Sequence, residues 1–183
     1  LKSSLKSKII ASLLTLFVLV LLILSGPVQA LTLNLSLNES SVSKGSTVEF
    51  IADIDINSNE TLDIDEITLE LNGPQLISCK FSPNGAAISG CNGITISQIL
   101  NANFGYGYGY NFGYGYGYGY QVGKLQYKIT LDTSILQSGT YSSNLMVKVV
   151  NQIFSQYGPD LKINAIINTN ANSSTNSNND DEN

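Results

Sequence analysis

The sequence predicts an all-β fold: an antiparallel sandwich of about seven strands, preceded by one hydrophobic helix at the N-terminus. Apolar and polar residues alternate with a period of two through much of residues 31–165, the pattern of strands with one buried and one wet face. Clusters of Gly, Pro, Asn and Ser separate these stretches and indicate turns. No stretch after residue 30 has the periodicity of an amphipathic helix, so short strands and turns account for the whole domain.

Residues 1–30 have the pattern of an export signal. Three lysines precede an uncharged, mostly apolar run at 9–24, and the residues up to Ala30 form a site of the kind that signal peptidase cleaves. The run is slightly long for a signal and short for a membrane span of about 20 residues. We expect cleavage after Ala30, with an uncleaved membrane anchor as the alternative. Either outcome would place the rest of the chain outside the cell, secreted or at the cell surface, with membrane contact only through an uncleaved segment.

The strands are expected in order along residues 31–167. Alternation is cleanest in six stretches: 31–37, 48–56, 67–71, 125–131, 145–149 and 161–165. The apolar halves of these strands should face one another across a shared core. The first stretch also admits a second interpretation, donation to a neighbouring subunit, which would build a filament by main-chain pairing.

Residues 43–50 (SKGSTVEF) form a glycine-containing turn that leads into an alternating strand, and residues 138–149 lead from Ser-Gly-Thr-Tyr into another. The first segment resembles the turn into the second strand, and the second resembles the approach to the penultimate strand, of the immunoglobulin-like domains of microbial (bacterial and archaeal) cell-surface proteins. The resemblance implies an immunoglobulin-like β-sandwich over residues 31–167. It also implies a tyrosine corner, in which Tyr141 hydrogen-bonds to backbone upstream. Patterns of this kind imply a fold and not a function.

A Gly-Tyr repeat at residues 103–120 departs from the pattern of those domains. It holds seven of the ten tyrosines: Tyr106, Tyr108, Tyr110, Tyr114, Tyr116, Tyr118 and Tyr120. Because alternate glycines make the backbone flexible, we expect an inserted loop outside the folding core. If the segment extends, every Tyr lies on one side and every Gly on the other, giving an aromatic surface for adhesion or ligand binding. The alternative is a low-complexity loop whose tyrosines fold back on the domain.

Cys79 and Cys91 are the only cysteines, and such a pair in an exported chain predicts a disulfide. If the turn at 83–85 is centred on Gly85, the two cysteines lie opposite each other. Two reduced thiols in the core are the alternative.

Two weaker signals concern calcium and glycosylation. Oxygen-rich clusters can hold calcium, and four acidic residues lie close together in the sequence: Asp53, Asp55, Asp63 and Asp65. Their spacing matches no EF-hand loop, so we favour a solvated strand edge and expect no metal. Four Asn-x-Ser/Thr triplets are possible glycosylation sites: Asn34, Asn38, Asn59 and Asn172.

The composition excludes several classes of function. The chain has no His and no Trp, so it offers no Ser-His-Asp or Cys-His nucleophile and no imidazole ligand for zinc. We expect neither enzyme activity nor a cofactor. After cleavage, six lysines and no arginine would stand against fourteen acidic residues, a net charge of 6 − 14 = −8, which disfavours nucleic-acid binding. Residues 168–183 are almost entirely polar or acidic and are expected to be disordered.

These observations lead to one main hypothesis and two alternatives. The main hypothesis is a secreted or cell-surface structural or adhesion protein that displays the Gly-Tyr loop on a β-sandwich. The alternatives are a carbohydrate- or ligand-binding module that uses the loop tyrosines, and a subunit of an extracellular filament joined by strand donation. The partner is expected to be a cell-surface glycan or protein, or a second copy of the chain.

Overall fold

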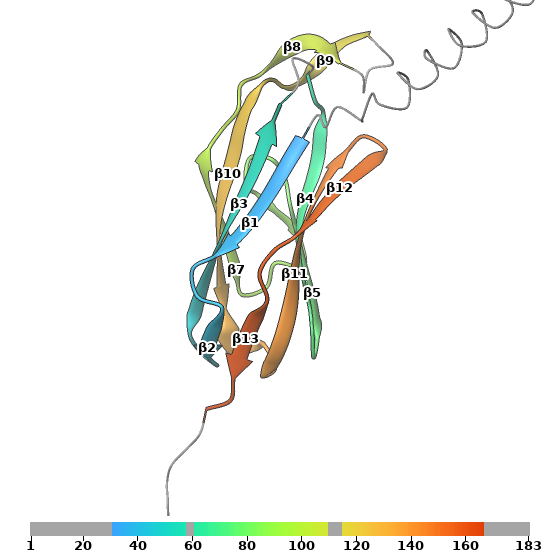
Figure 1. Ribbon diagram of the computed structural model, residues 1–183. Coiled ribbons are helices and arrows are strands. Elements are labelled where there is room, and N and C mark those ends of the chain that lie inside the picture. The colour runs from blue at the N-terminus through green and yellow to red at the C-terminus, as the bar shows by residue number, and fades with distance from the viewer. Residues whose placement is uncertain (1–30, 58–60, 110–114, 167–183) are drawn as a thin grey trace, which may run out of the picture.

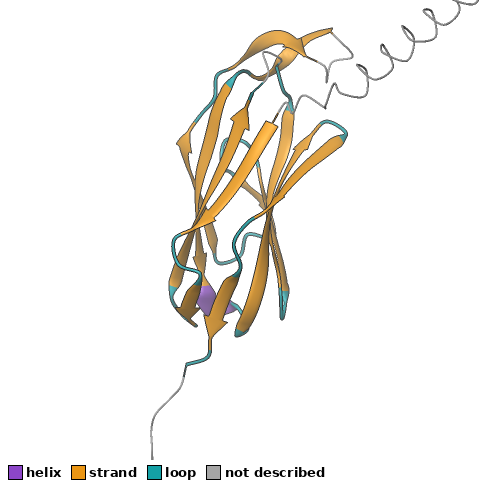
Figure 2. Cartoon of the chain, viewed as in Figure 1, coloured by secondary structure: helices purple, strands orange, loops and turns teal. Residues whose placement is uncertain are grey.

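The computed structural model describes residues 31–57, 61–109 and 115–166. Strands dominate this part of the chain, and its one helical element is the 3₁₀ turn η2 (Thr133–Ile135), as Figure 2 shows. The predicted all-β class is confirmed. The predicted N-terminal signal helix and the predicted disordered tail lie outside the described residues. Within the described residues, no helix has the length and apolar character needed to span a membrane.

Thirteen strands are present in the described part, against the predicted seven or so. They are β1 (Leu31–Leu37), β2 (Ser41–Ser43), β3 (Thr47–Ile56), β4 (Ile64–Asn72), β5 (Leu76–Phe81), β6 (Ala87–Ser89), β7 (Ile94–Leu100), β8 (Phe104–Gly109), β9 (Gly115–Tyr120), β10 (Gly123–Asp132), β11 (Gly139–Val149), β12 (Gln152–Tyr157) and β13 (Leu161–Asn164). The additional strands are mostly short or exposed, so alternation in the sequence marks them poorly.

The strands form two large sheets and one separate hairpin (Figure 1). The first sheet has the order β1-β3-β10-β7 and is antiparallel throughout. The second has the order β2-β13-β11-β4-β5-β6, with β12 also paired to β11, and its β2–β13 pair is parallel. The hairpin consists of β8 and β9 alone.

One hydrophobic core takes side chains from both large sheets. In β3, every second residue from Val48 to Ile56 is at most 2% exposed, and in β11 the same holds for Leu145 and Val147. Alternation with a period of two therefore buries one face of each strand, as the sequence indicates. The hydrophobic contribution of such burial is about 1.5–3 kcal/mol for each large aliphatic or aromatic side chain.

The first strand, β1, completes the fold of its own chain. It pairs antiparallel with β3 over its whole length, from Leu31 opposite Ile56 to Leu37 opposite Phe50. Leu31 and Leu35 are buried in the core. Donation of this strand to another subunit would therefore require it to leave a full set of partners.

Tyr141 makes the hydrogen bond that the sequence resemblance implies. Its ring is fully buried at the start of β11, and its hydroxyl donates to the Gln137 carbonyl oxygen at 2.9 Å. Burial raises the pKa of the Tyr141 hydroxyl. The bond fixes the corner between η2 and β11.

The molecule is elongated, and the β8–β9 hairpin caps one of its ends. The chain leaves β13 at the opposite end, as Figure 1 shows. Whatever the hairpin presents is thus directed away from the body of the domain.

Candidate functional site: an aromatic hairpin at one end of the domain

The hairpin register separates tyrosines from glycines. Phe104 lies opposite Tyr120, and Tyr106 lies opposite Tyr118, with glycine opposite glycine at each position between the aromatic pairs. Because successive side chains of a strand point to opposite faces, one face of the hairpin is aromatic and the other has no side chains. Tyr110 and Tyr114, two of the predicted ligand-binding tyrosines, lie outside the described residues.

Six rings form a continuous row, which we call the aromatic ladder. Its order is Tyr120, Phe104, Tyr118, Tyr106, Tyr116 and Tyr108. Successive centroids lie between 5.1 and 6.5 Å apart, and stacked pairs alternate with edge-to-face pairs. These distances lie in the range of favourable aromatic contacts, worth about 0.5–1.5 kcal/mol per pair beyond area burial. The ladder therefore stabilises the hairpin that displays it.

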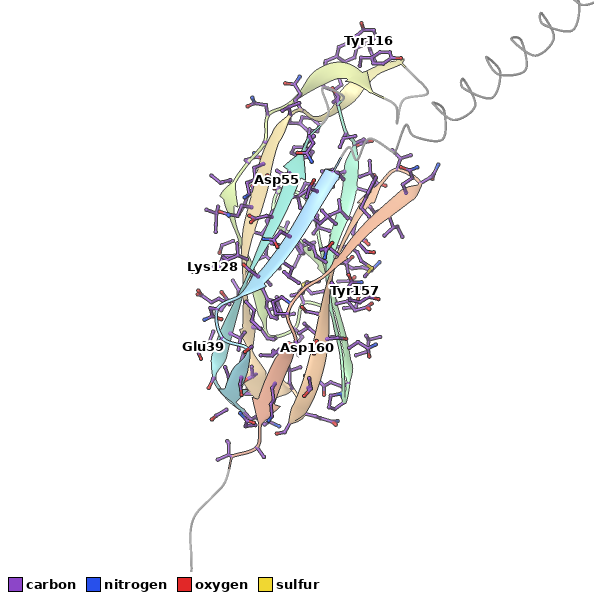
Figure 3. All side chains as sticks on the ribbon, in the orientation of Figure 1. Glu39, Asp55, Tyr116, Lys128, Tyr157 and Asp160 are labelled. Atoms are coloured by element: carbon purple, nitrogen blue, oxygen red, sulfur yellow. A yellow bond between two sulfur atoms is a disulfide. The ribbon has the colours of Figure 1, made fainter. Side chains whose placement is uncertain are left out.

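Most of the ladder is open to solvent. Tyr106, Tyr116 and Tyr118 are 60–67% exposed, and Figure 3 shows Tyr116 at the extreme end of the molecule. Phe104 and Tyr108 are also exposed. The exposed rings therefore form one contiguous row on the surface of the hairpin.

Tyr120 differs from the other ladder tyrosines. It is partly buried at the base of the hairpin and packs against the main core. Burial raises the pKa of its hydroxyl. Tyr120 is thus an attachment point for the hairpin rather than part of the exposed surface.

Backbone hydrogen bonds fasten the hairpin to the segment that enters β4. The amide of Leu62 donates to the Tyr120 carbonyl, and the amide of Tyr120 donates to the Leu62 carbonyl, both at 2.8 Å. The amide of Thr61 donates to the Tyr108 carbonyl at 2.9 Å. Both strands of the hairpin are therefore held.

Close approach to this segment explains the glycines on the hairpin's other face. A Cβ atom at Gly119 would lie 2.6 Å from the Leu62 carbonyl oxygen, and one at Gly107 would lie 2.0 Å from the Thr61 hydroxyl oxygen. Glycine thus lets the hairpin backbone approach the Leu62 backbone at position 119 and the Thr61 side chain at position 107.

The expectation of a loose inserted loop needs correction for the described part of the repeat. Residues 104–109 and 115–120 are paired strands outside the two large sheets, not an irregular loop. Ordering alternate glycines costs backbone entropy. The contact of the glycine face with residues 61–62 and the packing of the rings on one another offset that cost.

The predicted disulfide is present. Cys79 and Cys91 are bonded, with their Cα atoms 4.4 Å apart, and Cys79 is fully buried. The predicted turn is present too, with Gly85 at a φ of +83°. The register of this hairpin is irregular between Lys80 and Phe81, because Lys80 faces Ser89 and Phe81 faces Ala87. Gly90, at a φ of +69°, lies between the Lys80–Ser89 pair and the disulfide.

The four aspartates of the weak calcium candidate do not form a metal site. Asp53 lies 3.2 Å from the Lys124 ammonium nitrogen, and Asp65 lies 3.2 Å from that of Lys148. Asp55 is on the same outward face of β3 as Asp53, whereas Asp63 and Asp65 precede or begin β4 in the other sheet. In the described part of the chain, no group of three or more potential ligands is close enough to hold a metal ion.

Two of the four possible glycosylation sites are described, and both are exposed. Asn34 is on the outward face of β1. Asn38 follows β1, and its side-chain oxygen accepts a hydrogen bond from the Glu49 amide at 2.9 Å. Asn59 and Asn172 lie outside the described residues.

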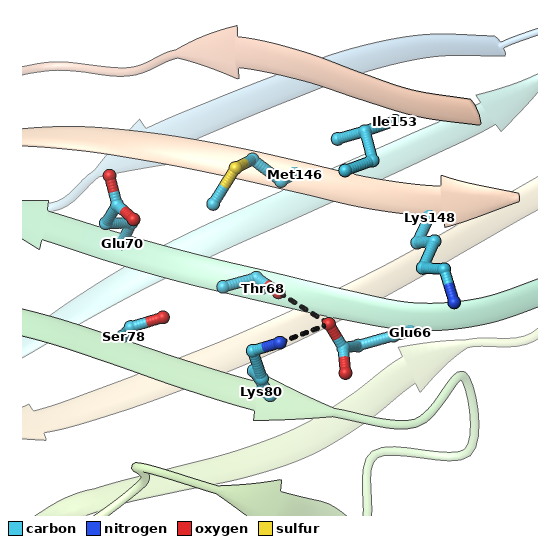
Figure 4. Close-up of a pocket in the computed structure, with 8 residues that line it drawn as sticks. All are labelled: Glu66, Thr68, Glu70, Ser78, Lys80, Met146, Lys148 and Ile153. Carbon is cyan, nitrogen blue, oxygen red and sulfur yellow. Dashed lines mark hydrogen bonds and ion pairs between the residues drawn. The ribbon is translucent and has the colours of Figure 1, made fainter. Parts of the chain in front are cut away.

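The structure also has a shallow hollow that the sequence analysis missed. It occupies about 250 Å³ on the outer face of the second sheet, and Figure 4 shows Lys80 and Thr68 both bound to the Glu66 carboxylate there. Lys148, on the rim, pairs with Asp65. These residues occupy outward positions on β4, β5 and β11. The sequence could have indicated that they lie together only if the pairing of these three strands had been deduced from it. Glu66, Lys80 and Lys148 are thus engaged in ion pairs, and Glu70 and Ser78 complete the polar part of the lining.

Comparison with known proteins identifies no family. No protein-family model matches the chain, and neither does any curated protein. Among solved structures, the chain is similar to a family 123 glycoside hydrolase from Clostridium perfringens (12% identity, TM-score 0.44) and to the sporulation control protein Spo0M from Bacillus subtilis (11%, 0.41). It is also similar to BslA, described as a bacterial hydrophobin (15%, 0.35).

These alignments cover 75–77% of this chain but very different shares of the other proteins. The chain spans 28% of the glycoside hydrolase, 51% of Spo0M and 98% of BslA. At such identities and TM-scores the likenesses carry no argument about function.

Proposed function

We propose that this chain is a non-enzymatic structural or adhesion protein of the cell exterior, and that it binds through the aromatic ladder. The observation that carries the proposal is the exposure of a row of stacked rings on a hairpin at the end of an elongated domain. Aromatic side chains supply large contact areas at a low cost in conformational entropy, which is why they dominate the centres of interfaces.

The scaffold in this proposal is an immunoglobulin-like sandwich. The strand orders support it, because β1-β3-β10-β7 follows the A-B-E-D order of such domains. In the other sheet, β13-β11-β4-β5 follows the order G-F-C-C′. The Tyr141 hydrogen bond at the corner before β11 also fits a tyrosine corner. The hairpin would then be an insertion between strands D and E.

An extracellular location is supported by the disulfide, since such bonds persist in oxidising compartments. The predicted export signal at residues 1–30 points the same way. Edman sequencing or intact mass of the exported protein tests cleavage: a mature chain beginning at Leu31 is expected, and a chain that keeps residues 1–30 would favour the membrane anchor.

The proposed partner is a second copy of this chain. Residues 81–123 contain no charged side chain, although the chain as a whole carries a net charge of −5. The described hairpin strands lie within this range, so two hairpins can meet without bringing fixed like charges of their own together. Strand edges are ordinarily protected by charges, prolines or bulges, and the described strands of the hairpin have none of these. Edge pairing or ring stacking between two hairpins would satisfy both surfaces.

Sedimentation velocity over a range of protein concentrations tests the proposal. Wild-type protein is expected to associate as concentration rises, and a variant with Ala at the four exposed ladder tyrosines (Tyr106, Tyr108, Tyr116 and Tyr118) is expected to remain monomeric. Tyr157→Ala is the matched control, because Tyr157 is 73% exposed on the second sheet, away from the hairpin (Figure 3). Equal behaviour of all three proteins would contradict the proposal.

The alternative function is carbohydrate recognition through the same rings. The exposed tyrosines favour it, since each offers a flat apolar ring and a hydroxyl that can hydrogen-bond. A glycan array separates the two functions. Binding to discrete sugars that the four-alanine variant loses, without self-association of the wild type, would favour the carbohydrate module.

A further inference from the structure

The exposed part of the ladder places phenol rings in pairs across the hairpin. Tyr106 contacts Tyr116 and Tyr118, with centroids 5.8 and 5.2 Å apart, and Tyr108 contacts Tyr116 at 5.5 Å. All four rings are at least 42% exposed. The residues between them are glycines, so no neighbouring side chain on either strand obstructs a ring that moves toward its partner. These four tyrosines are therefore accessible to an oxidant and already adjacent to one another.

The remaining composition leaves oxidation few other targets. The chain has no Trp and no His, and both cysteines are consumed by the disulfide. The single methionine, Met146, is partly buried, and its oxidation gives a sulfoxide that forms no cross-link. Tyrosine is thus the side chain from which a one-electron oxidant would most readily remove an electron.

We propose that the exposed ladder is a site of oxidative tyrosine cross-linking, in which a haem peroxidase or a comparable one-electron oxidant using hydrogen peroxide joins neighbouring rings across the hairpin. Each of two phenols loses one electron and one proton to give a phenoxyl radical. The radicals couple through a carbon–carbon bond between ring positions ortho to the hydroxyls. Each of those carbons then passes its hydrogen to the ring oxygen, which restores two phenols. In total, two tyrosines and one hydrogen peroxide give one dityrosine and two waters.

The arrangement of the pairs makes the proposal specific. Each of the three contacts involves Tyr106 or Tyr116. Among the ring contacts of the described residues, none joins Tyr108 to Tyr118. Two variants with equal numbers of phenols can therefore differ only in whether a pair remains. Replacement by Phe keeps the ring for stacking and removes the phenol.

The experiment treats dilute folded protein with peroxidase and hydrogen peroxide, in a background where Tyr110 and Tyr114 are Phe. Trypsin cleaves after Lys80 and Lys124, so one peptide, 81–124, carries the whole ladder. Tyr127, Tyr141 and Tyr157 fall in three other peptides. Mass spectrometry of the reduced digest then shows which peptides lose two hydrogens, and dityrosine fluorescence gives the yield.

We expect peptide 81–124 to lose two hydrogens while remaining a single peptide. Y108F/Y118F, which keeps the Tyr106–Tyr116 pair, should retain this product, and Y106F/Y116F should lose it at least tenfold. Circular dichroism melting of both variants confirms that the fold is unchanged. Equal yields from the two variants, or cross-links found chiefly on the Tyr157 peptide, would overturn the proposal.

Discussion

The attachment of the hairpin depends on the absence of a side chain at Gly119. Replacing Gly119 with Ala would put a Cβ atom 2.6 Å from the Leu62 carbonyl oxygen and 2.7 Å from its carbonyl carbon. Both atoms are backbone and cannot turn aside. The two strands must therefore separate at this point, and the reciprocal hydrogen bonds between Leu62 and Tyr120 are lost.

The size of the effect follows from those two bonds. Each backbone hydrogen bond contributes a net stabilisation of about 0.5–1.5 kcal/mol, so their joint loss costs about 1–3 kcal/mol. At about 1.4 kcal/mol for each factor of ten, local opening becomes roughly 5- to 150-fold more frequent. Because the hairpin lies outside both large sheets, the global free energy of unfolding should change much less.

Native-state hydrogen exchange measures this directly. In Gly119→Ala, the amides of Leu62 and Tyr120 should exchange faster by that factor, whereas the Leu145 amide in the central strand β11 should not change. Gly105→Ala is the matched control, since its Cβ atom would meet only the flexible end of Gln121, at 3.1 Å. Both variants remove one glycine from the unfolded chain, so that contribution cancels. Unchanged protection in Gly119→Ala, or equal loss in both variants, would refute the docking described above.

Three further predictions concern the domain. The Cys79–Cys91 bond closes a short loop, so its removal should lower the free energy of unfolding by about 2–3 kcal/mol in chemical denaturation. Free thiols in denatured, unreduced wild-type protein would show that the bond is absent. Tyr141→Phe should cost about 1 kcal/mol through the lost bond to a carbonyl, and Tyr157→Phe, at an exposed site, should cost nothing measurable in the same melts. Burial raises the pKa of Tyr127, whose hydroxyl donates to the Pro83 carbonyl. The folded state therefore keeps this proton after the unfolded chain releases it near pH 10, so stability should fall as pH rises above about 10, and less steeply in Tyr127→Phe; identical pH profiles would contradict this assignment.

The large sheets could be predicted from the sequence because their strands alternate strictly. β1 ends at the predicted residue, and β3 extends only one residue beyond its predicted stretch. Local turn chemistry was also reliable, since Gly45 and Gly85 adopt the positive φ that a turn favours. These features depend on neighbouring residues and on one buried face, both of which a single sequence displays.

Other features could not be predicted, because they depend on contacts between residues that are far apart in the sequence. β12 is an edge strand in which Ile153 is 67% exposed, so its apolar residues do not mark a buried face. Asp53 and Asp65 are close in sequence, but β3 and β4 belong to different sheets. Each carboxylate therefore meets a lysine from another strand instead of the other.

The hairpin is the clearest case. Glycine at alternate positions argues against a strand on entropy alone. What offsets that cost is the contact of Gly107 and Gly119 with residues 61–62, more than forty positions earlier in the chain, together with the ring contacts of the ladder. The sequence did indicate that an extended repeat would separate tyrosines from glycines. It could not indicate what the glycine face would contact.

We propose that the hairpin carries association and that the rest of the domain folds without it. Replacing residues 104–119 by a short Gly-Ser link keeps Asn103 and Tyr120. It also keeps the hydrogen bond at the base of the hairpin, which the Gln121 amide donates to the Asn103 carbonyl. Shortening a loop changes its closure entropy only slowly with length, so stability should change by about 1 kcal/mol. Sedimentation velocity of this variant, over the concentration range in which the wild-type protein associates, is the most direct test. We expect a compact monomer at every concentration. Association equal to that of the wild type, or an expanded and aggregating chain, would contradict it.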